Sequence, residues 1–200
     1  AFLKDAYESF YDMSVSRKIN YSFSSDASAL LVYFDHQKLE RILFNLLSNA
    51  FKFTKDKGSI SLQVEEVKYT PEKDFVTVEI AVSDNGIGMP EAIQGQIFDN
   101  FFQHHTDTEK LNQGSGIGLA ITKEFVTLHR GEIKVQSKPE EGSTFSFTLN
   151  LRVADSAADM EMPVSGANEA MAAAEEEADN RQEMRTKPLI LIVEDDEDFR

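Results

Sequence analysis

The fold of this chain is decided by one stretch, Gly114-Ser115-Gly116-Ile117-Gly118-Leu119-Ala120. Three glycines alternate with other residues, and an apolar run with helical spacing continues to Leu128. Glycine has no Cβ, so backbone N–H groups here can come close to a bulky anion, and a helix start adds partial positive charge. By itself this pattern is only a weak indication of a phosphate-binding loop.

A long helix with one apolar packing face and one polar face is expected before this loop. Asp35 is a suitable N-cap, and the apolar spacing predicts a helix from there to about Phe53. Asn45, Asn49 and Lys52 stand at i, i+4 and i+7, so they share a face apart from the leucine-rich one. Amide oxygens suit Mg²⁺, which usually also binds water and phosphate, and a lysine can contact phosphate. A solvated polar stripe is the alternative interpretation.

A carboxylate and two glycines follow a predicted strand. Residues 75–83 alternate in hydrophobicity and lead directly into Asp84-Asn85-Gly86-Ile87-Gly88. A carboxylate held above a glycine turn at a strand end can accept a hydrogen bond from an exocyclic amine such as adenine N6. Asp-Asn-Gly is equally good turn chemistry, so a plain turn is the alternative.

An aromatic cluster precedes a polar segment in front of the glycine stretch. Phe98-Asp99-Asn100-Phe101-Phe102 is followed by the polar residues 103–113. This arrangement predicts a hinge and a mobile lid. The alternative is a patch of core aromatic residues beside an ordinary surface loop.

The remaining pattern indicates a mixed α/β domain. Helical spacing over residues 1–18 predicts an amphipathic packing helix, and Gly131 is expected as the C-cap of a helix over residues 119–129. The other expected elements are strands at 19–23, 30–34, 59–68, 132–137 and 143–151 and a short helix at 91–96.

Composition excludes several kinds of partner. The net charge of −15 disfavours nucleic acids and anionic membrane surfaces, because both require a basic surface. The hydrophobic content of 41% and the 15 phenylalanines support a real core. The sequence has no cysteine, signal peptide or membrane-spanning run, and we expect it to be a cytoplasmic piece of a longer protein.

The last part of the chain differs in composition. Residues 153–186 are rich in Ala, Glu, Asp and Met and predict an acidic disordered linker. Residues 188–193 then predict a buried strand, with Glu194 and Asp195 at its C-terminal end. One strand without sheet partners cannot fold as a domain, so we expect residues 154–200 to be largely disordered or held by an exposed sheet edge.

Taken in chain order, the four stretches at residues 45–52, 84–88, 98–102 and 114–118 resemble four motifs of the catalytic ATP-binding domain of sensor histidine kinases. These motifs are the N box, the first glycine box, the F box and the second glycine box. The resemblance covers about residues 18–151 and implies an α/β two-layer sandwich, with a mixed, mostly antiparallel sheet and helices on one face. Thr144 matches the family's late Gly-x-Thr position near the adenine. Glu194-Asp195 resembles the acidic Mg²⁺ pair that begins a receiver domain, which would make the longer protein a hybrid kinase.

The resemblance assigns roles to individual residues. Asn49 would ligate Mg²⁺, Asn45 would support the phosphate–metal site, and Lys52 would contact phosphate, so these three are the expected catalytic residues. Asp84 would read adenine N6. The other expected ATP-binding residues are Gly86, Gly88, Phe98, Gly114, Ser115, Gly116, Ile117, Gly118, Leu119 and Thr144.

The resemblance also implies domain boundaries. They are the end of an upstream helix at 1–18, the ATP-binding domain at 19–152, the linker at 153–186 and a truncated receiver strand at 187–200.

The implied activity is transfer of the γ-phosphoryl group of Mg–ATP to a histidine on a dimerisation domain outside this chain. None of His36, His104, His105 and His129 has the sequence context of that acceptor. We therefore expect a monomer with little autokinase activity, which in the full-length protein forms a homodimer and contacts its dimerisation and receiver domains. The family usually lies at the bacterial inner membrane.

Two alternatives remain at this point. The ATP-hydrolysing relatives carry a general-base glutamate where this chain has Asn45, and an amide cannot act as a base, so hydrolysis is disfavoured. A nucleotide-binding module without transfer activity is not excluded. Many family members have Arg or Lys near Gln103, so the lid-side contact to the γ-phosphate is in question, with Lys110 as a possible substitute.

Overall fold

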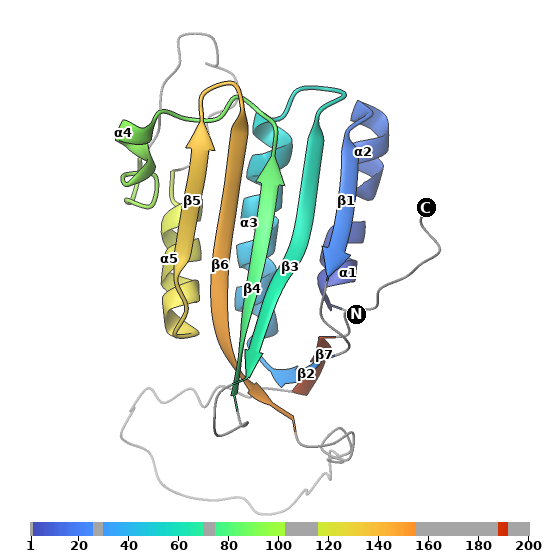
Figure 1. Ribbon diagram of the computed structural model, residues 1–200, viewed down its shortest axis with the longest axis vertical. Helices are drawn as coiled ribbons and strands as arrows, with labels where there is room; N and C mark the ends of the chain where they lie inside the picture. Colours follow the sequence, from blue (N-terminus) through green and yellow to red (C-terminus); the bar gives the residue numbers. More distant parts are fainter. Residues whose placement is uncertain (1, 26–29, 70–74, 103–115, 155–187, 192–200) are drawn as a thin grey trace, which may run out of the picture.

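The computed structural model describes residues 2–25, 30–69, 75–102, 116–154 and 188–191. They form one sheet with helices packed on one of its faces (Figure 1). The strands are β1 (Asn20–Ser25), β2 (Leu30–Tyr33), β3 (Ser59–Tyr69), β4 (Phe75–Asp84), β5 (Ile133–Lys138), β6 (Gly142–Val153) and β7 (Pro188–Leu191). The helices are α1 (Phe2–Glu8), α2 (Tyr11–Arg17), α3 (His36–Phe53), α4 (Glu91–Gln94) and α5 (Gly118–Leu128).

The sheet is mixed and mostly antiparallel, which confirms the predicted fold class. Its strand order is β1-β3-β4-β6-β2-β7, and β5 pairs with β6. Only β1 and β3 run parallel among the described pairs. No helix in the described part of the chain combines the length and apolar character needed to cross a membrane.

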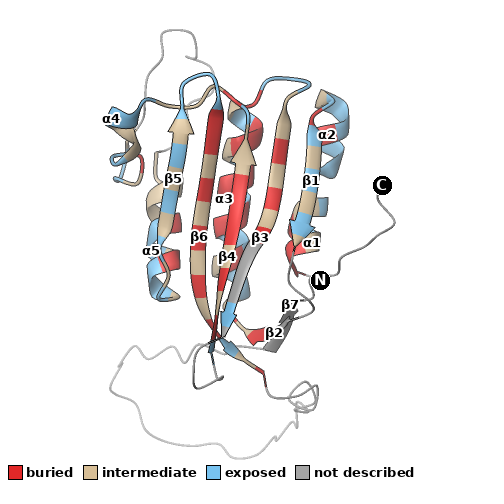
Figure 2. Cartoon of the chain, in the orientation of Figure 1, coloured by how far each residue is buried: buried red, intermediate tan, exposed pale blue. Residues whose placement is uncertain are grey.

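Alternation along β4 and β6 builds the core, although Ala81 of β4 is buried as well, outside the core cluster. The two strands pair antiparallel, with Ile80 opposite Phe147, and every second side chain is buried against the helices. Figure 2 shows this alternation as buried and partly exposed bands along the strands. The buried side chains are Val76, Val78, Ile80 and Val82 from β4 and Phe145, Phe147, Leu149 and Leu151 from β6.

Helix α3 begins and ends where the sequence predicts. The Asp35 side chain accepts a hydrogen bond from the Lys38 backbone N–H at 3.1 Å, which satisfies one of the unpaired donors of the first turn. The helix lays one apolar face on the sheet, made of Leu39, Ile42, Leu43, Leu46, Leu47, Ala50 and Phe51.

The first 18 residues form two short helices where the spacing predicts one. The break comes at Ser9 and Phe10, between α1 and α2. The Phe10 ring enters the core, where it stacks on Phe51 at 5.3 Å and contacts Phe44 at 5.2 Å between ring centroids. Burial of this ring therefore prevails over continuation of the local helix.

The end of α5 differs from the prediction that Gly131 is its C-cap. His129 is the C-cap, and Arg130 adopts the left-handed conformation with φ 55°. The Gly131 N–H donates to Val126 O at 3.0 Å and the Arg130 N–H to Thr127 O at 2.9 Å, which is a Schellman motif. Gly131 is required for a different reason, since a Cβ there would lie 1.7 Å from the Thr148 carbonyl oxygen of β6.

The C-terminal strand pairs with the edge of the sheet. Pro188–Leu191 runs antiparallel to β2, with Leu30 opposite Leu191 and Tyr33 opposite Pro188. Residues 192 and 193 of the predicted strand 188–193 lie outside the described residues. Glu194 and Asp195 lie outside the described residues, as does most of the predicted linker, and the domain boundaries stay predictions.

Arg130 and Gly131, which follow the C-cap of α5, should respond to mutation in opposite ways. Gly131→Ala should lower the free energy of unfolding by about 2–3 kcal/mol, because its methyl group would force α5 away from β6. Arg130→Gly should leave it unchanged or raise it by up to about 1 kcal/mol, because glycine adopts φ 55° without strain. Urea unfolding of both variants tests this, and equal destabilisation by the two would contradict it.

Candidate functional site

The loop that carries Asp84, Gly86 and Gly88 lies at one end of the sheet, where β4 ends, β6 begins and α3 ends (Figure 1). Asp84 is the last residue of β4 and is half-buried. Its Oδ1 accepts a hydrogen bond from the Gly86 N–H at 2.8 Å. Burial raises the pKa of the Asp84 carboxyl, and hydrogen bonds from the Gly86 and Ser143 amides offset part of that rise.

The glycine loop after Asp84 is held between α3 and the β5–β6 hairpin. The Ile87 N–H donates to the carbonyl of Phe53, the last residue of α3, at 3.2 Å. On the other side the Glu140 N–H donates to Ile87 O at 2.7 Å. Gly88 has φ 60°, and a Cβ there would lie 1.8 Å from the Lys138 carbonyl oxygen. The loop conformation therefore depends on glycine at position 88.

Asn45 joins α3 to the start of α5. Its Nδ2 donates to Thr122 Oγ1 at 2.8 Å, and the Thr122 hydroxyl donates to Gly118 O at 3.0 Å. A Cβ at Gly118 would lie 2.2 Å from Asn45 Oδ1, so this glycine makes room for the asparagine. Two residues predicted from separate motifs, Asn45 and Gly118, are thus in direct contact.

Asn49 and Lys52 continue along α3 from Asn45. The Asn49 side chain is half-buried and makes no hydrogen bond to a described residue, so its amide oxygen is available to a ligand. Lys52 is exposed, with its Nζ 5.0 Å from the centroid of the Phe53 ring. An amide oxygen with an ammonium group one turn away fits the chemistry of a Mg²⁺–phosphate site.

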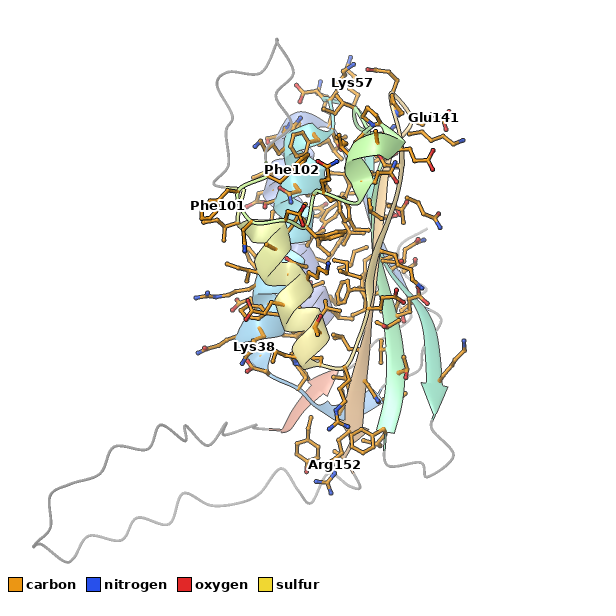
Figure 3. All side chains as sticks on the ribbon, turned by 90° about the vertical axis from the view of Figure 1, so that its left-hand side faces the viewer. Lys38, Lys57, Phe101, Phe102, Glu141 and Arg152 are labelled. Carbon is orange, nitrogen blue, oxygen red and sulfur yellow. The ribbon has the colours of Figure 1, made fainter. Side chains whose placement is uncertain are left out.

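The aromatic cluster before the predicted lid is hydrogen-bonded to the chain that follows the lid. The Phe101 N–H donates to Gly116 O at 2.9 Å, so the chain before residue 102 meets the chain after residue 115. Phe101 has φ 64° and is 72% exposed, whereas Phe98 and Phe102 pack against the core. Figure 3 shows Phe101 projecting outward and Phe102 pointing inward.

Several residues of the predicted lid and of the Gly114–Gly118 stretch lie outside the part of the chain that the structure describes. Gln103, Lys110, Gly114 and Ser115 lie outside the described residues, so their predicted roles stay predictions. Ile117 and Leu119 flank Gly118 at the start of α5, and both are partly buried.

The side chain of Thr144 faces away from that of Asp84, although both residues line the same cavity, and its predicted role at the adenine stays a prediction. Its Oγ1 lies 2.9 Å from Ser83 Oγ, on the sheet face opposite the helices, because Ser83 and Thr144 pair across β4 and β6. Asp84 pairs with Ser143, and both side chains face the helices. Ser143, which we did not predict, therefore shares a sheet face with Asp84. Parity could have identified it, since Phe145 and Phe147 on the same strand are the buried residues.

A cavity of about 610 Å³ opens beside Asp84. Its walls include Ser137 and Ser143, whose hydroxyl oxygens are 3.0 Å apart, and Gln94 of α4, whose Nε2 donates to Ser137 O at 2.7 Å. None of the described α3 residues lines it. Asp84 therefore lines the cavity under α4, whereas Asn49 and Lys52 lie on a face of α3 outside it.

The chain matches a known family over most of this fold. Residues 34–153 match the family described as "Histidine kinase-, DNA gyrase B-, and HSP90-like ATPase". Histidine kinase P4 of Formosa agariphila is 35% identical over 153 residues, covering 75% of this chain and 11% of that protein. Sensor histidine kinase TmoS of Ectopseudomonas mendocina is 36% identical over 182 residues, covering 86% of this chain and 18% of that protein. The chain therefore spans less than a fifth of either relative.

Solved structures share the fold. The catalytic domain of histidine kinase ThkA aligns with a TM-score of 0.62 at 26% identity, covering 74% of this chain and 91% of that one. Full-length ShkA in complex with AMPPNP aligns with a TM-score of 0.61 at 24% identity, covering 80% and 32%. The chain belongs to the family of histidine kinase-, DNA gyrase B- and HSP90-like ATPases, as a catalytic domain of the histidine kinase type.

Proposed function

We propose that this domain binds Mg–ATP and presents the γ-phosphoryl group for transfer to a histidine on another domain. The observation that carries the proposal is Asp84, a half-buried carboxylate beside a cavity, with no ion pair to a described residue. A carboxylate accepts hydrogen bonds only, so at this place it favours a ligand that presents an N–H donor, as adenine N6 does. Family membership supports ATP as that ligand.

The phosphate end of the nucleotide would lie along α3. Asn49 would supply an amide oxygen to Mg²⁺, and Lys52 would place its charge beside the phosphates. The ion, when bound, would neutralise part of the charge on the phosphate oxygens. The domain itself would contribute positioning and charge stabilisation, which dominate phosphoryl transfer.

Asn45 supports transfer over hydrolysis as the outcome. Its amide is bonded to Thr122 and packed against Gly118, so it fixes the start of α5 and cannot remove a proton from water. The alternative function, ATP hydrolysis by this domain alone, therefore lacks its base at this position.

The longer protein would be a hybrid kinase in two-component signalling. A hybrid histidine kinase of Dictyostelium discoideum is 32% identical over 142 residues, and a ThkA structure was solved in complex with the response regulator TrrA. We propose a dimerisation domain with the acceptor histidine elsewhere in the protein, which pairs as a homodimer. A receiver domain would begin near residue 188 and use Glu194 and Asp195 for Mg²⁺.

Calorimetric titration with a non-hydrolysable ATP analogue tests the site directly. Wild type should bind only with Mg²⁺ present, and Asn49→Ala should bind at least tenfold more weakly because it lacks the metal ligand. Asp84→Asn should lose at least as much, since its amide donor would face the adenine amine. Asp56→Asn is the matched control, because it makes the same chemical change at an exposed carboxylate that does not line the cavity, and it should bind normally. Failure of the wild type to bind would overturn the proposed function.

Binding should also depend on pH through Asp84. Because burial raises the pKa of this carboxyl, it should take up a proton, and lose its acceptor role, at a pH above the ordinary value of about 3.9. Affinity in the wild type should therefore fall as the pH is lowered through that range. Binding by Asp84→Asn should fall less, because only the phosphates of the nucleotide still titrate, and parallel pH profiles for the two proteins would contradict the assignment.

The same shift predicts a stability difference. A carboxyl with a raised pKa in the folded state stabilises the fold in acid, and that contribution is lost as the pH rises through the folded-state pKa. Asp84→Asn has no such loss, and its amide oxygen can still accept the Gly86 N–H. Its free energy of unfolding, measured in urea, should therefore rise relative to wild type from about pH 4 to neutrality. A relative fall would show that the charged form is favoured.

A further inference from the structure

The C-terminal end of α3 is held by groups from two distant parts of the chain. The last carbonyls of a helix have no partner within it. Arg17, the last residue of α2, donates from Nη1 to Phe51 O and from Nη2 to Thr54 O. Between these two carbonyls, Phe53 O accepts from the Ile87 N–H of the glycine loop at 3.2 Å. Arg17 and the Asp84–Gly88 loop therefore bind different carbonyls of the last turn of α3 and its C-cap, Thr54.

Arg17 makes further contacts with the segment after α3. Its Nε lies 2.8 Å from Asp56 Oδ1, and its own carbonyl accepts from the Lys57 N–H at 3.1 Å. The Asp56 side chain is 72% exposed, so this ion pair contributes little. The contacts with the carbonyls matter more, because a cation there also meets the negative end of the α3 dipole.

The geometry of the contact requires arginine. One planar guanidinium reaches two carbonyl oxygens and a carboxylate at the same time, whereas a lysine ammonium is a single point charge on a flexible stem. The Arg17 side chain is 29% exposed, so much of it is covered by protein.

We propose that Arg17 is a positioning residue for the nucleotide site. By fixing the last turn of α3, it sets the place of Lys52 and of the Phe53 carbonyl. That carbonyl holds the Ile87 N–H, and so fixes the loop that carries the Asp84–Gly86 hydrogen bond. The inference rests on the proposed function. It adds that the affinity for nucleotide depends on α2, which precedes the ATPase domain, through the contacts of Arg17 with the end of α3.

Three variants separate this role from ordinary stabilisation. Arg17→Met keeps the apolar stem and removes all donors, Arg17→Lys keeps the charge without the fork, and Asp56→Asn removes only the exposed ion pair. Affinity for the ATP analogue with Mg²⁺ is measured well below the unfolding midpoint of each protein. We expect about a tenfold loss for Arg17→Met, a smaller loss for Arg17→Lys and no change for Asp56→Asn.

Amide hydrogen exchange of the nucleotide-free proteins provides an independent arm. The Ile87 and Thr54 amides should exchange faster in Arg17→Met than in wild type, and at the wild-type rate in Asp56→Asn. If Arg17→Met does not fold, the same two measurements on Arg17→Lys decide.

The outcomes distinguish the two proposals. A lower unfolding midpoint in Arg17→Met with unchanged affinity and unchanged Ile87 exchange would overturn the role of Arg17, because the residue would then only stabilise the fold. Absence of binding by the wild type would overturn the proposed function. The exchange of Ile87 would still support or overturn the connection between α2 and the glycine loop.

Discussion

The packing of α3 against the buried faces of β4 and β6 is the contact on which the rest of the structure depends. Seven α3 side chains are buried, and each of them except that of Ala50 contributes on the order of 1.5–3 kcal/mol. Because this burial fixes the rotation of the helix, it also fixes where Asn45, Asn49 and Lys52 point. The register of β4 with β6 places Asp84 opposite Ser143, at the strand end where α3 also ends. One apolar contact thus positions a polar site contributed by distant segments.

How far the sequence predicts this structure depends on whether the deciding interaction is local. Helix α3 and its Asp35 cap were predictable because period and capping are read from neighbouring residues. The break at Phe10 was not, since it follows from the contact of that ring with Phe51, which is distant in sequence. The conformations of Arg130 and Gly131 depend on how closely β6 approaches. Ser143 rather than Thr144 shares a sheet face with Asp84 because of the strand pairing across the sheet, which a motif alone does not specify.

Function and stability oppose each other at Asp84. Burial makes its ionised form costly, and its described hydrogen-bond donors are backbone amides without a full positive charge. A chain selected for stability alone would place a neutral residue there. Asn45 and Gly118 show the opposite case, because their contact serves the packing of α3 on α5 and the shape of the site together. Some site residues in this fold therefore lower its stability, and others contribute to its packing.

The hydrogen bond between Phe101 and Gly116 has a consequence for evolution. It brings together the two ends of the intervening segment, so the domain outside that segment is complete whatever its length. The entropy of closing a loop grows only with the logarithm of its length, and each doubling costs about 0.6 kcal/mol. Insertions and deletions between these two residues are therefore nearly neutral for folding. Selection can change the size and sequence of residues 103–113 in response to a new partner while the sheet and α3 remain as they are.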